Sequence, residues 1–186
     1  MESVKDYLEK LEINNNILNK QLSDVNISKV TYFKEERLIY IYLSSKNIIS
    51  YDYIELFRNE LKQRLDYFRD IKVKIRYIKL EKQKTKDIIK KYWNNIVHIL
   101  TVLCPSLNGW VKGIEYMCID DTLKIKIPSD LFYKRLMKQN AIQVLKNVLS
   151  EEAGIDIDII FEKSINKGPN VDKLIEQNDS LVEAMV

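Results

Sequence analysis

The order of secondary-structure signals occurs twice along the chain, and this repetition constrains the fold more than any other feature. Residues 27–57 read as a strand, an acidic turn, a second strand and a capped helix, and residues 111–136 read in the same order. The predicted turns are Glu35-Glu36 and Asp120-Asp121. Apolar and polar residues alternate along the predicted strands, which is the pattern of half-buried strands. The sequence therefore predicts two small α+β domains.

The first predicted domain covers residues 27–81. Strands over 27–34 and 37–45 precede a helix for which Ser50 is the N-cap, and alternation from Ile71 to Tyr77 predicts a third strand. The resulting order is β-β-α-β. Residues 1–26 carry apolar side chains at helical spacing and predict two short helices that pack on this domain. Those apolar positions are Val4, Tyr7, Leu8, Leu11, Ile17, Leu18, Leu22 and Val25.

The second predicted domain covers residues 85–163. Its first helix stops before Pro105, and a hairpin over 114–119 and 122–127 follows. Ser129 and Asn140 then cap two helices, Gly154 ends the second of them, and residues 155–161 alternate as a strand. The order is α-β-β-α-α-β. In each domain we expect a three-stranded sheet with helices on one face.

Two polar segments divide the chain. The run "EKQKTK" at 81–86 places the domain boundary within residues 79–87. Residues 164–186 predict a linker and a helix with one apolar stripe that stops without a cap, which suggests a truncated helix leading into a longer protein. We expect residues 171–186 to be poorly packed.

Composition narrows the chemistry that the chain can perform. Two cysteines and one histidine cannot supply a Cys/His zinc site, and no cofactor is predicted. No apolar run reaches the roughly 20 residues of a membrane helix, and no signal peptide is recognisable, so we expect a cytoplasmic protein with free thiols. The net charge of +3 neither requires nor excludes a nucleic-acid partner.

Candidate catalytic residues are few. His98 has no serine or cysteine and carboxylate at the spacing of a nucleophilic site, and it is interpreted as a helix histidine. Asp120-Asp121 could suggest a metal or acid/base site, but the pair lies at a predicted hairpin tip, where aspartate suits the turn. The segment "GWVKG" at 109–113 precedes a strand, unlike a phosphate-binding loop. We therefore predict no catalytic residue and no metal ligand.

One predicted surface, the outward face of the first sheet, combines basic and aromatic side chains. If the apolar residues of the third strand face the helices, Lys72, Lys74 and Arg76 share the opposite face, and Tyr40 and Tyr42 lie on it as well. Aromatic rings among basic residues can bind single-stranded nucleic acid. Two alternatives remain open: a solvated sheet face, or a face covered by the N-terminal helices. Residues 27–81 hold 12 basic and 8 acidic residues, whereas residues 85–163 hold 11 and 10.

Residues 92–162 resemble the N-terminal region of the PolC-type DNA polymerase III α subunit, the replicative polymerase of low-GC Gram-positive bacteria. The resemblance rests on Tyr92-Trp93, Pro105-Ser106, "DDTLKIKIPSD" and "GIDIDIIFE", and in the first domain on "SYDYIELFRNELKQRL". It implies that the first domain is similar to the α-binding domain V of the clamp-loader τ subunit. It also implies that the second domain is similar to type II KH domains. The second domain resembles, in addition, the N-terminal domain of the initiator DnaA.

The resemblance also suggests a function. KH domains grip nucleic acid through a Gly-x-x-Gly loop, but residues 136–141, "LMKQNA", contain no glycine, and only Lys138 remains as a cation there. Protein binding is the better inference for this domain, with Trp110 and Lys138 as candidates. We expect a non-catalytic interaction region of the polymerase that binds replisome proteins, on the clamp-loader, helicase or initiator side, and single-stranded DNA. The alternative is a free-standing nucleic-acid-binding protein of two small modules.

Overall fold

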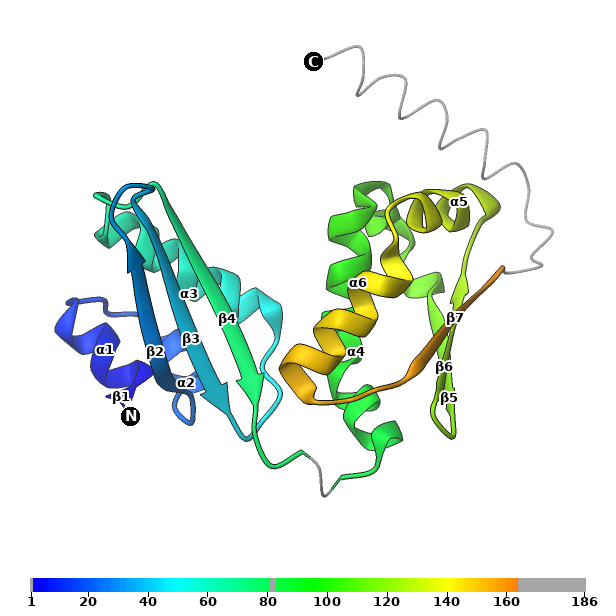
Figure 1. The fold of residues 1–186 in the computed structure, drawn as a ribbon, viewed down its shortest axis with the longest axis horizontal. Helices are drawn as coiled ribbons and strands as arrows, with labels where there is room; N and C mark the ends of the chain where they lie inside the picture. The colour runs from blue at the N-terminus through cyan, green and yellow to red at the C-terminus, as the bar shows by residue number, and fades with distance from the viewer. Residues whose placement is uncertain (1, 81–82, 164–186) are drawn as a thin grey trace, which may run out of the picture. The chain divides into compact units, whose positions relative to one another are not determined.

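The computed structural model describes residues 2–80 and 83–163 (Figure 1). The chain divides into two compact units: the first ends at Lys84 but also includes residues 150–154, and the second begins at Thr85. Both units are α+β, as predicted, with a four-stranded sheet in the first and a three-stranded sheet in the second. Each unit is described below by itself. The predicted linker and truncated helix at 164–186 lie outside the described residues.

The sheet of the first unit has the strand order β1-β2-β3-β4. Its strands are β1 (Glu2–Ser3), β2 (Asn26–Phe33), β3 (Leu38–Ser45) and β4 (Asp70–Tyr77). β2 and β3 form an antiparallel hairpin, whereas β4 lies parallel to β3, because the helix α3 (Tyr51–Arg64) returns the chain to the same end of the sheet. The prediction of three strands missed β1, which pairs only with Asn26 and Ile27.

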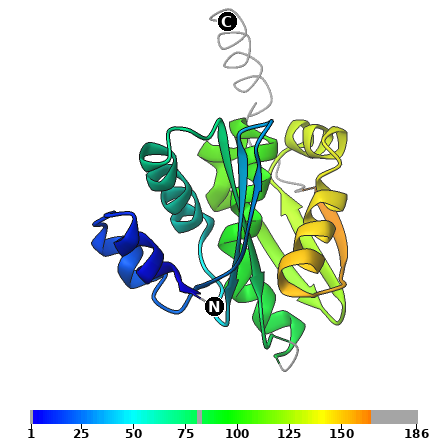
Figure 2. The same ribbon diagram turned by 60° about the vertical axis from the view of Figure 1, so that its left-hand side comes forward.

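The helices of the first unit lie on one side of this sheet, which Figure 2 shows nearly edge-on. α1 (Val4–Lys10) and α2 (Asn16–Gln21) are the two short helices that were predicted, and Ser50 caps α3 as expected. Asn15 donates from Nδ2 to Glu60 on α3 at 2.8 Å, and Arg64 donates from Nε to the Leu11 carbonyl at 2.8 Å. These bonds fix the N-terminal helices on the α3 side, so the alternative in which they cover the basic face is wrong.

One predicted core position of the N-terminal helices is also wrong. Ile17 is 56% exposed, while its neighbour Leu18 is fully buried. α2 has only six residues, and a helix this short buries one narrow stripe. Leu18 fills that stripe, and Ile17 points away from it.

The second unit begins with α4 (Thr85–Leu103), which ends before Pro105 as predicted. Its remaining elements are η1 (Pro105–Gly113), β5 (Glu115–Ile119), β6 (Thr122–Ile127), α5 (Asp130–Lys138), α6 (Ala141–Val148) and β7 (Asp158–Lys163). Between α6 and β7 the chain forms η2 (Leu149–Ala153), of which all but Leu149 is grouped with the first unit. β5 and β6 form the predicted hairpin, and β7 lies parallel to β6 at its other side. The inward residues of the central strand, Leu123, Ile125 and Ile127, are fully buried.

Local signals account for most boundaries in the second unit. Ser129 accepts a hydrogen bond from the Phe132 amide at 3.3 Å and so caps α5. Asp120 adopts φ 50° at the hairpin tip, and Gly154 adopts φ +67° after α6, both as the sequence indicates. The 3₁₀ segment η1 was not predicted. The last strand begins at Asp158 rather than at 155, although Ile155 and Ile157 are buried.

Candidate nucleic-acid interface

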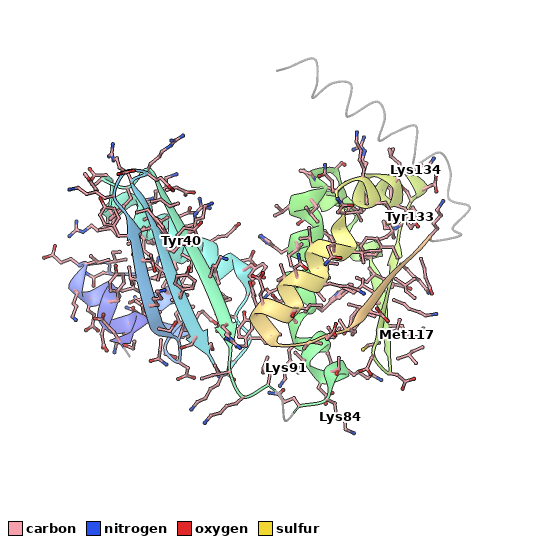
Figure 3. The ribbon with its side chains drawn as sticks, in the orientation of Figure 1. Tyr40, Lys84, Lys91, Met117, Tyr133 and Lys134 are labelled. Carbon is pink, nitrogen blue, oxygen red and sulfur yellow. The ribbon has the colours of Figure 1, made fainter. Side chains whose placement is uncertain are left out.

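The strand register brings together all five residues predicted for the basic face of the first sheet. Tyr40 lies opposite Lys72, and Tyr42 lies opposite Lys74, on the parallel strands β3 and β4. Arg76 follows two residues later on the same face of β4. The three cations are exposed, and the two tyrosines are half-buried. In Figure 3 the label of Tyr40 lies over this sheet.

Strand β2 adds a cation that sequence reasoning missed. Lys29 lies opposite Tyr42, so it shares the face of the tyrosines, and Phe33 reaches the same face at the end of β2. The signal was weak, because the β2 sequence "NISKVTYF" places apolar residues on both faces and a bulge shifts its register between Ile27 and Lys29. We call the set of Lys29, Tyr40, Tyr42, Lys72, Lys74 and Arg76 the basic tyrosine face.

The rings and cations of this face are in contact with one another. The rings of Tyr40 and Tyr42 are nearly parallel, at 20°, with centroids 6.2 Å apart. Lys72 Nζ lies 5.8 Å from the Tyr40 centroid, and Lys29 Nζ lies 5.7 Å from the Tyr42 centroid. Phe33 packs edge-on against Tyr40 at 5.7 Å. Each tyrosine thus carries one lysine over its ring, from opposite sides of β3.

The cations of the basic tyrosine face have no acidic partner within ion-pair distance among residues 2–80 and 83–163. Asp70, at the start of β4, is bound instead by Arg58 at 2.9 Å. Desolvation raises the pKa of Asp70, but the hydrogen bonds from Arg58 and from the Ile71 amide, together with the charges of Arg58 and Lys72, lower it overall. The positive charge of the face is therefore available to an anionic ligand.

On the outward face of the second sheet, in contrast, the lysines are paired with acidic residues. Lys124 pairs with Glu162, and Lys126 pairs with Glu115, each at 3.2 Å. The other outward side chains there include Met117, which is 51% exposed and is labelled in Figure 3, and also Ile119 and Ile160. The second face is therefore charge-paired and aliphatic, with no tyrosine pair like that of the first.

The two residues predicted to bind protein partners lie on separate elements. Trp110 is on η1, is 36% exposed, and tilts against Phe132 with ring centroids 6.3 Å apart. Lys138 is the last residue of α5 and is exposed. No interaction joins the two side chains in the part of the chain that the structure describes. After Lys138, Asn140 takes the left-handed conformation (φ 52°) in this junction without glycine.

His98, the aspartate pair and the cysteines are of residue types suited to catalysis or metal binding, but the sequence predicts neither role for them. His98 is half-buried within α4, and Asp120 and Asp121 occupy the hairpin tip. Cys104 and Cys118 are free and buried, and burial raises the pKa of the Cys118 thiol. Within residues 2–80 and 83–163, no three or more His, Cys, Asp and Glu side chains gather as a metal site would require. None of the helices described is long and apolar enough to span a bilayer.

Comparison with known protein families identifies relatives of both units. The family model described as DNA polymerase III polC-type N-terminus I matches residues 3–75. The model described as DNA polymerase III polC-type N-terminus II matches residues 91–186. A search of curated proteins found no match. The two family matches together cover most of the chain, in the order of its two units.

Proposed function

Since the chain belongs to the N-terminal regions I and II of the PolC-type DNA polymerase III family, we propose that it is a non-catalytic interaction region of that cytoplasmic polymerase. Its proposed ligand is single-stranded DNA, which binds to the basic tyrosine face. The observation that carries this proposal is the position of Lys29 and Lys72 over Tyr42 and Tyr40, on a face whose cations form no ion pair with any of the residues that the structure describes.

Base stacking competes with the lysines for the tyrosine rings. An exposed cation over a tyrosine ring contributes about 0.5–1 kcal/mol, whereas a base stacked on an aromatic side chain contributes about 1–3 kcal/mol. A base therefore displaces the lysine head from the ring at a net gain. Because the lysine stem is long and flexible, the displaced ammonium can bind the adjacent phosphate.

The phosphate contacts give the proposal a measurable salt dependence. Each phosphate neutralised on a single strand adds a slope of about −0.7 to a plot of log affinity against log salt. Four cations on the face set the limit, at a slope of about −2.8. The tyrosines contribute affinity with no charge, so stacking and phosphate contacts can be measured separately.

Protein partners form the second part of the proposal. Replisome proteins on the clamp-loader, helicase or initiator side would bind the second unit, with Trp110 and Lys138 as contact residues. Trp110 supports this proposal, because it keeps 36% of its side chain exposed while Phe132 holds its ring in place. A large aromatic side chain held in this way is typical of an interface anchor. Changing Trp110 to alanine should weaken pull-down of a replisome partner without changing the affinity for DNA.

The test of DNA binding is a titration of a fluorescent oligothymidine at several salt concentrations. Changing Lys72, Lys74 and Arg76 to alanine should weaken binding and flatten the salt slope by about 2 units. Changing Tyr40 and Tyr42 to leucine should weaken binding and leave the slope unchanged.

The matched control changes Lys124 and Lys126 to alanine. These lysines also lie on the outward face of a sheet, but each is paired with a glutamate. This control should bind the oligonucleotide like the unsubstituted chain. Failure to bind at low salt, or an equal loss in the control and in the triple variant, would refute the proposed site.

A further inference from the structure

Most of the outer edge of β2 pairs with no other strand in the described part of the first unit. β1 covers only Asn26 and Ile27, so residues 28–33 have no strand on that side. From Lys29 to Phe33 the segment pairs with β3 without a shift in register. Its N–H and C=O groups on the outer side therefore have the regular spacing of a β-strand. An exposed, regular edge can pair with an added strand.

Three of the six side chains along this edge are large hydrophobic groups that remain exposed. Val30 is 44% exposed and Tyr32 is 43% exposed on the helix side of β2, and Phe33 is 43% exposed on the other side. Edge strands that avoid pairing carry charges at such positions. Lys29 and the bulge beside it discourage pairing in that way, but only next to Asn26 and Ile27, the two residues that β1 covers.

An aromatic cluster continues this edge at the hairpin end. Tyr32 packs edge-on against Phe68, with centroids 5.2 Å apart, and its hydroxyl lies 3.3 Å from the hydroxyl of Tyr67. Tyr67 is 53% exposed, and the Arg37 guanidinium lies 4.8 Å from the centroid of its ring. Tyrosine and arginine in contact are the residue types most enriched at the centres of protein interfaces.

Arg37 is held in an unusual backbone conformation. Its φ is 51°, in the left-handed region that disfavours residues other than glycine and asparagine. Three hydrogen bonds hold it there: its amide donates to Lys34, its carbonyl accepts from Arg69, and its Nε donates to the Tyr67 carbonyl. The terminal guanidinium nitrogens have no partner in the part of the chain described. The hairpin thus presents a fixed cation at the end of the sheet where β2 turns into β3.

We propose that the edge of β2 from Ser28 to Phe33, together with Arg37 and Tyr67, binds an extended acidic peptide from a partner protein as an additional strand. In a sheet, side chains directly opposite each other share a face. Apolar residues at alternate peptide positions would therefore cover Val30 and Tyr32. A carboxylate at the end of the peptide nearest the hairpin would pair with the Arg37 guanidinium in the bidentate manner that arginine favours. This proposal does not depend on DNA binding: Lys29 belongs to both surfaces, but strand pairing uses the backbone of β2, and Val30 and Tyr32 lie on the face opposite the tyrosine pair.

The experiment uses the whole chain and a fluorescein-labelled peptide, Glu-Val-Thr-Val-Thr-Val-Glu. Two further peptides carry N-methyl groups, one on the valine amides and one on the threonine amides. Since alternate amides of a strand point to opposite sides, one methylated peptide should lose binding about tenfold or more, and the other should bind almost normally. A peptide with lysine in place of both glutamates should bind about tenfold more weakly than the parent peptide.

The matching protein variant is Arg37→Gly. Glycine adopts φ near 50° without strain, which partly offsets the loss of the Nε hydrogen bond to the Tyr67 carbonyl. The variant should therefore stay folded at the assay temperature while its dissociation constant for the acidic peptide rises about tenfold. In the control variant, Lys72, Lys74 and Arg76 are changed to alanine. This variant should bind the peptide within about twofold of the unsubstituted chain, because β4 lies at the opposite edge of the sheet from β2.

Several results would overturn the proposal. These are no peptide binding, equal binding of the two methylated peptides, or an unchanged affinity in Arg37→Gly. Loss of oligothymidine affinity in Arg37→Gly, with peptide affinity unchanged, would assign this edge to nucleic acid instead. The methylated peptides are tested on the unsubstituted chain, so the proposal stays testable even if the glycine variant folds poorly.

Discussion

The two units should unfold independently, and a matched pair of core substitutions tests this. Ile41 lies on β3, between β2 and β4, and Ile125 lies on β6, between β5 and β7. Both side chains are fully buried in the core of their own unit. Changing either residue to valine removes one buried methylene and keeps the branched shape that strands favour.

The expected effect of each substitution can be estimated from burial. Losing one buried methylene costs about 0.8 kcal/mol in transfer free energy, and Ile-to-Val changes in cores cost about 0.5–1.5 kcal/mol in unfolding free energy. For units of this size, 1 kcal/mol lowers the melting temperature by about 4–8 °C. Each variant should therefore show a clear shift in the unit that carries the change and none in the other.

The assay uses the uneven distribution of tryptophan. Both tryptophans, Trp93 and Trp110, belong to the second unit, so tryptophan fluorescence follows the unfolding of that unit alone. Far-ultraviolet circular dichroism follows both units. Ile125→Val should shift the fluorescence transition, whereas Ile41→Val should shift a component of the dichroism signal and leave the fluorescence transition in place.

A single result would refute this reasoning. If Ile41→Val lowered the fluorescence midpoint as much as Ile125→Val does, the two sheets would belong to one cooperative core. In that case substitutions on the basic tyrosine face could not be assumed to leave the second unit intact, and the binding experiments would need a separate control for folding.

Four further outcomes are expected. Limited proteolysis should first cut the two units within residues 79–87, since this run is the only long polar segment between them; earlier cleavage elsewhere would argue against the proposed boundary. The purified chain with magnesium should show neither polymerase nor nuclease turnover, and turnover that disappears on changing Asp120 and Asp121 to alanine would contradict their role in a turn. Hydrogen bonds from two lysines lower the pKa of Asp130 to about 2 from 3.8, so its stabilisation is present above pH 3.8 and is lost as the pH falls through 2. The difference in melting temperature between Asp130→Asn and the unsubstituted chain should therefore shrink over that interval. Cys118 should react slowly with an alkylating reagent at pH 8, because burial raises its thiol pKa, and rapid labelling would contradict that burial.

The central strands could be predicted from sequence because their periodicity is strong. Ile39, Ile41 and Leu43 alternate with tyrosines, and this alternation places Tyr40 and Tyr42 on the outward face with no further information. The caps Ser50 and Ser129 are equally local signals. The architecture of both units and five residues of the basic tyrosine face follow from such short-range patterns.

The features that were missed depend on contacts between distant parts of the chain. β1 has two residues, too few to show any period, and it is a strand only because it pairs with β2. The turn at Glu35-Glu36 was predicted, but the positive φ falls on Arg37, where hydrogen bonds to residues near the end of α3 hold it. Lys29 was missed for a similar reason, since a bulge determines which face it occupies.

The register also decides which lysines are neutralised, and this leads to a final prediction. Both sheets present lysines on the outward face of a strand, but only those of the second sheet lie opposite glutamates. Lys124 faces Ile160 across the ladder with Glu162 in reach, and Lys126 lies directly between Glu115 and Glu162. The exposed ion pairs contribute little to stability, within about 1 kcal/mol each, so their main effect is to cancel the charge of the face.

Changing Glu115 and Glu162 to glutamine should therefore create DNA binding on the second sheet. The substitutions free Lys124 and Lys126, and two freed cations should add about −1.4 to the salt slope for oligothymidine. The measurement is made on a chain whose Lys72, Lys74 and Arg76 are already alanine, so that the first sheet contributes little. Since Met117, Ile119 and Ile160 offer no aromatic ring for stacking, the new binding should vanish at moderate salt. Binding that persists there, or no gain at low salt, would show that the pairing of charges does not determine which sheet binds DNA.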